Sequence, residues 1–202
     1  EGVVNAVSSA TEFLINGQKV LIDDGTEFEH GSAVDIAVGS KLEVKGKLNA
    51  DGKLVANEIK FLSEANIEIH GVVSAIDATA GTITVMGVQV KVNNFTLMED
   101  ETAMMVRYFG LDDLAAGDLV KLHVYVDAGN ALVATQLERE DVTTTVKLEG
   151  PVSSVNGTQV VIAGITVELA GLGVTPAVGN KLEVSGSYAN SLLTATSATI
   201  DN

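Results

Sequence analysis

The amino-acid sequence predicts an all-β protein built from three tandem five-stranded Greek-key barrels. Three observations lead to this fold class. Valine, threonine and isoleucine recur in short alternating runs, as expected of strands that bury one face. The stretch VGSKLEVKG at 38–46 returns as VGNKLEVSG at 178–186, and a weaker copy, AGDLVKLHV, occupies 116–124. Two further landmarks accompany each copy in the same order, which indicates tandem domains.

These landmarks divide the chain into three repeats. One landmark precedes each copy of the nine-residue stretch: EGVVNAV (1–7), HGVVSAI (70–76) and EGPVSSV (149–155). The other landmark follows it: GKLVANEIKF (52–61), NALVATQLER (130–139) and NSLLTATSATI (190–200). We therefore predict barrel domains at residues 1–64, 65–143 and 144–202.

Each repeat contains five predicted strands, punctuated by Gly, Asn and Asp residues that suit tight hairpin turns. In the first repeat the predicted strands are 2–8, 11–16, 18–23, 40–48 and 53–61. In the second they are 67–77, 81–86, 88–93, 118–127 and 131–139. In the third they are 146–155, 158–163, 165–169, 180–188 and 192–200. The nine-residue stretch is thus strand four, and its inward-facing residues are Leu42, Val44, Leu182 and Val184.

The segment between the third and fourth strands varies among the repeats and is longest in the second. There, apolar residues recur at roughly helical spacing from Met98 to Phe109, and Gly110 suits the end of a helix. Acidic residues at 99–101 suit the first turn, because they face the positive end of the helix dipole. We therefore predict one short helix over 99–109, between strands three and four of the middle repeat.

Three strands, a helix and two strands is the order of the OB barrel, whose long first strand bends to pair in both halves of the sheet. A glycine in mid-strand favours such a bend, and Gly71 and Gly150 occupy that position. Gly2 is equivalent to them, so the first repeat lacks the leading half of its strand. This predicts either a strand half or another repeat upstream of Glu1.

Composition disfavours several classes of partner. The chain carries 27 acidic and 12 basic residues, for a net charge of −15, whereas nucleic-acid binding relies on clustered bases. It has no Trp and few other aromatic residues on which sugars or single-stranded bases could stack. There is no Cys, and no apolar run approaches the roughly 20 residues that span a bilayer. We predict no nucleic-acid partner and no transmembrane segment.

Four residues of the middle repeat form the densest polar and aromatic cluster: Arg107, Tyr108, Asp112 and Asp113. They border the face on which OB barrels bind ligands, and they are our candidate ligand-binding residues. The alternative is a helix end packed on the barrel, with Asp residues capping the next turn. The middle repeat is also the most acidic, with 12 acids and 4 bases (net −8), against −5 and −2 for the others.

Other candidate sites have simpler explanations. The three histidines, His30, His70 and His123, lack the spacing of metal ligands, and His70 suits an exposed strand position. Residues 23–27 and 49–52 resemble calcium loops faintly, but turn chemistry explains them. No nucleophile elbow, phosphate loop or carboxylate pair is present. We predict no metal, no cofactor and no enzymatic activity; an active site built across a barrel interface is the weakest alternative.

The landmarks resemble a bacterial family, domain-of-unknown-function family 5666, which forms tandem small β-domains in secreted or lipid-anchored proteins. The resemblance lies in the G-x-V-x-x-V openings at Gly2, Gly71 and Gly150 and in the strand that follows Gly39, Gly117 and Gly179. It covers essentially the whole chain and supplies no catalytic residues. It implies export to the periplasm or cell surface, with a lipidated cysteine upstream of Glu1 as one form of attachment.

We therefore expect a non-enzymatic exported protein of the cell envelope that acts as a binding or structural module. The partner would be an envelope protein or a small ligand. The alternative is a periplasmic protein that binds a small ligand or a cation through the middle barrel.

Overall fold

The computed structural model describes residues 1–29, 31–62, 65–127 and 129–201. Strands dominate it, and the only helical segments among these residues are two short 3-10 turns. The chain divides into two compact units, of which the first contains residues 1–64 and the second contains residues 65–126 and 131–202. The predicted domain boundary at residue 64 falls outside the described residues.

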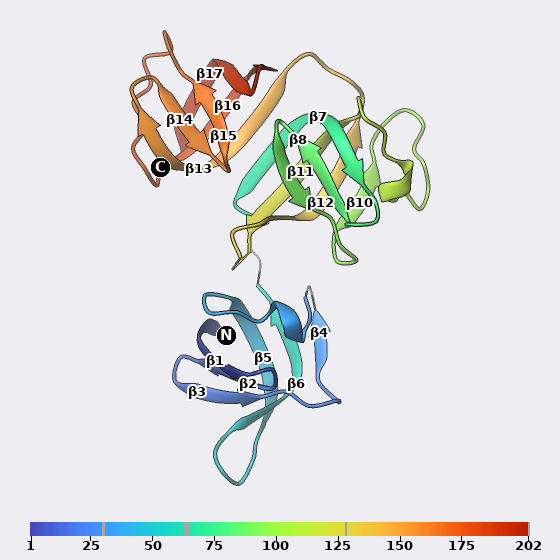
Figure 1. Cartoon of the computed structure of the whole chain (residues 1–202), viewed down its shortest axis with the longest axis vertical. Helices are drawn as coiled ribbons and strands as arrows, with labels where there is room; N and C mark the ends of the chain where they lie inside the picture. Colours follow the sequence, from blue (N-terminus) through green and yellow to red (C-terminus); the bar gives the residue numbers. More distant parts are fainter. Residues whose placement is uncertain (30, 63–64, 128, 202) are drawn as a thin grey trace. The chain divides into compact units, whose positions relative to one another are not determined.

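The first unit is a closed five-stranded barrel (Figure 1). Its strands are β1 (Gly2–Ser9), β2 (Glu12–Ile15), β3 (Gln18–Leu21), β5 (Lys41–Leu48) and β6 (Leu54–Phe61). Neighbours around the barrel are antiparallel, except that β3 pairs parallel with β6. The resulting order β1-β2-β3-β6-β5, closing on β1, is the OB order and confirms the predicted fold class for this repeat.

The second unit contains two more barrels with the same order (Figure 1). One consists of β7 (Ile67–Asp77), β8 (Thr82–Val85), β9 (Val88–Lys91), β11 (Leu119–Val126) and β12 (Leu132–Glu140). The other consists of β13 (Val146–Asn156), β14 (Gln159–Ile162), β15 (Ile165–Glu168), β16 (Lys181–Ala189) and β17 (Leu192–Asp201). In each, the third strand closes the barrel by parallel pairing with the fifth. The predicted boundary at 143/144 lies in the connector between β12 and β13.

The two barrels of the second unit share one sheet, because β7 pairs antiparallel with β13. Ile69 pairs with Leu148 at the centre of this seam, and each lies two residues before the mid-strand glycine of its own repeat. Equivalent residues therefore face each other about a local two-fold axis. Both side chains are fully buried, and one apolar core runs through both barrels.

The residues predicted to face the barrel cores do so. Leu42, Leu182 and Val184 are buried, whereas Val44 is only partly buried. Val44 is less buried than Val184 because its strand has less of a neighbour. In the first barrel β1 pairs with β5 at two positions, whereas in the third barrel β13 pairs with β16 at six. The mid-strand glycines permit close approach: a Cβ on Gly150 would lie 3.0 Å from Ile162 Cγ2 and 3.2 Å from Ile67 Cγ1.

The helix predicted over 99–109 is wrong. Residues Leu97–Asp100 form a strand, β10, which pairs parallel with β12, and the helical turn that follows, η2 (Leu111–Asp113), is a short 3-10 turn. The first barrel has an equivalent added strand, β4 (Glu27–Glu29), parallel to β6. Met105 and Tyr108 have φ of 45° and 60°, which an α-helix does not allow.

Candidate functional site

The segment between the third and fourth strands is where the second barrel departs most from the first. In both barrels it begins with a threonine hydroxyl that donates to a carbonyl of the last strand, and it ends in a 3-10 turn capped by an aspartate. The hydroxyl of Thr26 donates to the Ala56 carbonyl, and that of Thr96 donates to the Ala134 carbonyl. The 3-10 turns are η1 (Ala33–Asp35), capped at Ser32, and η2, capped at Gly110. Between Thr26 and Ser32 lie five residues, whereas thirteen lie between Thr96 and Gly110. We call the eight additional residues, 101–108, the inserted loop.

Asp100, the last residue of β10, anchors the inserted loop to the barrel. Its side chain is 0% exposed. Its carboxylate accepts hydrogen bonds from the Thr102 backbone N–H (3.2 Å), the Thr102 hydroxyl (2.8 Å) and the Val106 backbone N–H (2.7 Å). Arg139 donates two more, from Nε at 3.0 Å and Nη2 at 2.8 Å. Hydrogen bonding by Arg139, aided by these backbone donors, holds the pKa of Asp100 well below its usual range despite the opposing effect of burial.

Arg139 connects this anchor to η2. The residue is 7% exposed, and its guanidinium carbon lies 4.6 Å from the centre of the Phe109 ring. Its Nη1 donates to the Asp113 carbonyl at 3.2 Å and lies 3.6 Å from Asp118 Oδ2. Hydrogen bonding to Asp100 raises the pKa of Arg139 further, so the ion pair stays charged.

A charged residue at this point of the barrel is particular to the middle repeat. Arg139 pairs across the sheet with Val120. The residues in the same register of the other barrels are apolar: Phe61, opposite Leu42, and Ile200, opposite Leu182. Burying two charges has a desolvation cost that well-packed apolar residues avoid. In the middle repeat this desolvation cost therefore occurs at the position where the inserted loop is attached.

The outer part of the inserted loop exposes large apolar side chains. Met104 is 72% exposed, Met105 76% and Tyr108 97%. The positive φ of Met105 and Tyr108 is a strained conformation for bulky residues, and such strain is found most often at functional sites. Exposed apolar groups on an anchored loop are typical of a recognition surface.

The predicted site residues divide between the inserted loop and η2. Arg107 and Tyr108 are exposed on the loop, while Asp112 and Asp113 are exposed on η2. Asp113 caps that turn by accepting from the Gly110 N–H at 2.9 Å, as the capping alternative predicts. Across the described residues, no hydrogen bond or ion pair joins the two Asp residues to Arg107 or Tyr108. Sequence reasoning missed Asp100 and Arg139, which hold the site together.

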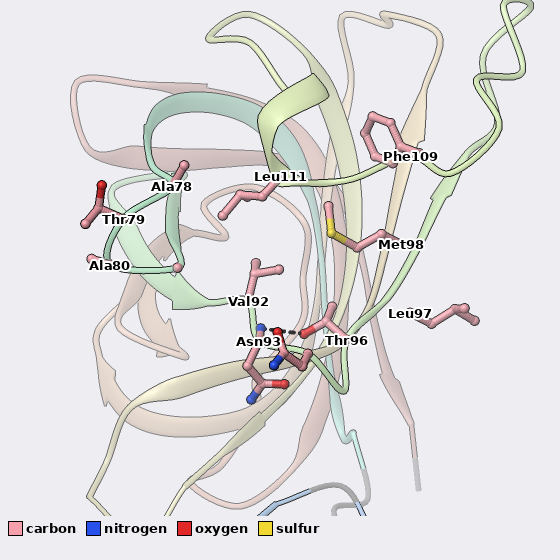
Figure 2. Close-up of a pocket in the computed structure, with 12 residues that line it drawn as sticks. Ala78, Thr79, Ala80, Val92, Asn93, Thr96, Leu97, Met98, Phe109 and Leu111 are labelled. Atoms are coloured by element: carbon pink, nitrogen blue, oxygen red, sulfur yellow. Dashed lines mark hydrogen bonds between the residues drawn. The ribbon is translucent and has the colours of Figure 1, made fainter.

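A hollow of about 600 Å³ lies beside the inserted loop, at the end of the barrel (Figure 2). The turn between β7 and β8, with Thr79, forms one side of it, and this turn is the longest of the three equivalent turns. Val92, Met98 and Phe109 give it an apolar floor, and Asn93 lies at its edge. None of the described residues that line it is ionisable.

The structure also places other residues considered as sites. His70 is buried rather than solvent-facing; its Nε2 lies 3.1 Å from Glu140 Oε2, and His30 lies outside the described residues. The supposed calcium loops are turns, in which Asp23 and Asn49 accept backbone N–H groups two residues ahead. In the described parts of the chain, no three His, Asp or Glu residues cluster as metal ligands would. Those parts also contain no helix with the length and apolar character needed to cross a membrane.

Comparison with known proteins identifies a family. Searches of curated proteins and of solved structures each found no match. The sequence profile of the family described as Domain of unknown function (DUF5666) matches three segments, residues 1–60, 70–138 and 149–198. Each segment corresponds to one barrel, and together they cover most of the chain. The protein therefore belongs to the DUF5666 family, with three consecutive copies of its domain.

Proposed function

We propose that this chain is a non-enzymatic, exported protein of the bacterial envelope that binds a protein partner through the inserted loop of its middle barrel. The observation that carries the proposal is the buried Asp100–Arg139 pair, which fixes a loop whose apolar side chains point into solvent. The other two barrels supply the scaffold. The acidic surface favours solubility and disfavours anionic partners.

Site-specific photo-cross-linking tests this proposal in cells that produce the full-length protein naturally. With p-benzoylphenylalanine at Tyr108, we expect a discrete cross-linked adduct with another protein. The matched control places the same residue at Val34, which is 92% exposed on η1 of the first barrel, where no loop is inserted. Equal labelling at both positions, or none at Tyr108, contradicts binding through the inserted loop. Fractionation of the same cells tests export, and protein confined to the cytoplasm contradicts it.

The hollow supports a second candidate, a periplasmic protein that binds a small ligand or a cation through the middle barrel. Its apolar floor and uncharged edge favour a neutral ligand over a cation. A ligand at about 100 times its Kd stabilises the folded state by about 2.7 kcal/mol, which thermal melts detect. We expect Ala80→Trp, which fills the hollow, to abolish such a shift, and Ala10→Trp, on the equivalent turn of the first barrel, to preserve it. The same melts with calcium test a cation as the ligand. A rise in melting temperature with calcium, and with no neutral ligand, contradicts a neutral-ligand site.

A further inference from the structure

The charge around the inserted loop limits which partner it fits. Glu101, the first residue of the loop, is exposed, as are Asp112 and Asp113 on η2, and Glu99 is partly exposed on β10. Arg107 is the single exposed base between residues 97 and 118. Arg139, which holds the loop, is paired with Asp100. Met104, Met105 and Tyr108 therefore form an apolar tip with acidic surroundings.

Like charges disfavour several occupants of this tip. A second copy of the chain would bring together two molecules of net charge −15. An anionic membrane would oppose the same acids. A neutral lipid surface would remove water from Glu101 and Asp112 without supplying a positive partner. A segment with apolar residues and Lys or Arg satisfies both parts of the surface.

We propose that the inserted loop docks a cationic amphipathic segment of another protein, whose apolar side chains cover Met104, Met105 and Tyr108. Its basic side chains face Glu101 and Asp112 at the edge of the contact. This inference rests on the proposed function and adds the chemistry of the partner. The anchoring of the loop favours it, because a surface already held in place loses little conformational entropy on binding.

Binding of matched synthetic peptides to the full chain tests the partner chemistry. The probe is a short amphipathic helix of Leu and Lys. Its controls are the same pattern written with Leu and Glu, and a Ser and Lys peptide of equal charge. We expect the Leu/Lys peptide to bind, the Leu/Glu peptide not to bind, and the Ser/Lys peptide to bind only weakly and in low salt.

Two variants separate the tip from the general negative charge. Met104→Ser with Met105→Asn and Tyr108→Asn removes the apolar groups and leaves the charge unchanged. Asn tolerates the positive φ at 105 and 108, so the loop keeps its fold. We expect this variant to weaken binding of the Leu/Lys peptide by about tenfold or more. Glu101→Gln with Asp112→Asn should weaken it less and reduce its dependence on salt.

The inference is overturned if the tip variant binds the Leu/Lys peptide as wild type does, since binding then reflects net charge alone. Tip-dependent binding to phosphatidylcholine vesicles, or tip-dependent dimerisation in sedimentation, also overturns it by identifying another occupant. Failure of the partner chemistry is distinguishable from failure of the proposed function. A specific protein adduct at Tyr108 without a response to the Leu/Lys peptide leaves the binding loop in place and rejects only a cationic amphipathic partner.

Discussion

Replacing Arg139 by isoleucine will lower the free energy of unfolding of the second unit by about 3–5 kcal/mol. The variant places in the middle barrel the residue that the third barrel has in the same register, Ile200. In the third barrel that residue packs against the apolar core. In the middle barrel it leaves the buried Asp100 without its cation, and the charged form of that group then loses two hydrogen bonds.

Urea denaturation followed by tyrosine fluorescence measures this loss in the full chain. The chain has no Trp, and its three tyrosines, at 108, 125 and 188, all belong to the second unit. The signal therefore reports that unit alone. Unchanged stability in Arg139→Ile would mean that Asp100 reaches water without cost and that the loop is not anchored by a buried pair.

A double variant separates the stability of the barrel from the order of the inserted loop. Asp100→Leu with Arg139→Ile removes both charges, and we expect a stability within about 1–2 kcal/mol of wild type. The loop loses the acceptor for the Thr102 and Val106 N–H groups, so it becomes mobile. Trypsin should then cleave after Arg107 much faster than in the wild type. Slow cleavage in the double variant would contradict anchoring by Asp100.

The Asp100–Arg139 pair also makes the free energy of unfolding depend on pH. Because its folded-state pKa lies below the ordinary value near 4, ionised Asp100 contributes stability that is fully present above pH 4. That contribution is lost as pH falls below the unfolded value toward the lower folded one. In Arg139→Ile the buried Asp100 lacks its cation, so burial favours its neutral form. The stability difference between wild type and Arg139→Ile, measured by urea denaturation, should therefore be largest near pH 7 and shrink as the pH falls.

Local pattern was sufficient to predict the barrels. Period-two alternation and glycine turns place the long strand of the middle repeat at 67–77, and β7 spans Ile67–Asp77. Both signals depend on neighbouring residues only, and a barrel strand must alternate because one face fills the core. The repeats strengthened the prediction of strands, since each sequence landmark could be compared with two further copies.

The inserted loop was misinterpreted because its apolar spacing has a different cause. The pattern from Met98 to Phe109 indicated one buried face of a helix, yet Met104 and Met105 face solvent and only Phe109 is buried. The N–H groups of Thr102 and Val106, which a helix would pair with backbone carbonyls, are taken by the Asp100 side chain. Such competition depends on Arg139, 39 residues further along the chain, so no local window reveals it.

One signal for the site was present in the sequence. Counting from strand four places Arg139 where the first repeat has Phe61, and an Arg in an apolar register indicates a buried partner. The seam had no such signal. Ile69 and Leu148 alternate as core residues of separate barrels would, and nothing local shows that two such strands also pair with each other.

Replacing Leu148 by alanine will lower the unfolding free energy of both barrels of the second unit, by about 3–4 kcal/mol. Leu148 is 0% exposed at the local two-fold axis, opposite Ile69, inside the core that the two barrels share. A cavity there removes contacts on both sides of the seam. A unit with one continuous sheet and one core should also unfold in a single transition.

Tyrosine reporters distinguish a shared core from two adjoining ones. Tyr188→Phe leaves tyrosines only in the middle barrel, and Tyr108→Phe with Tyr125→Phe leaves Tyr188 as the reporter of the third. We expect the two reporters to give the same urea midpoint, and Leu148→Ala to lower both together. Leu42→Ala, at an equally buried position in the separate core of the first unit, should leave both midpoints unchanged. If Leu148→Ala shifts only the Tyr188 reporter, the pairing of β7 with β13 does not couple the barrels, and each must be stable by itself.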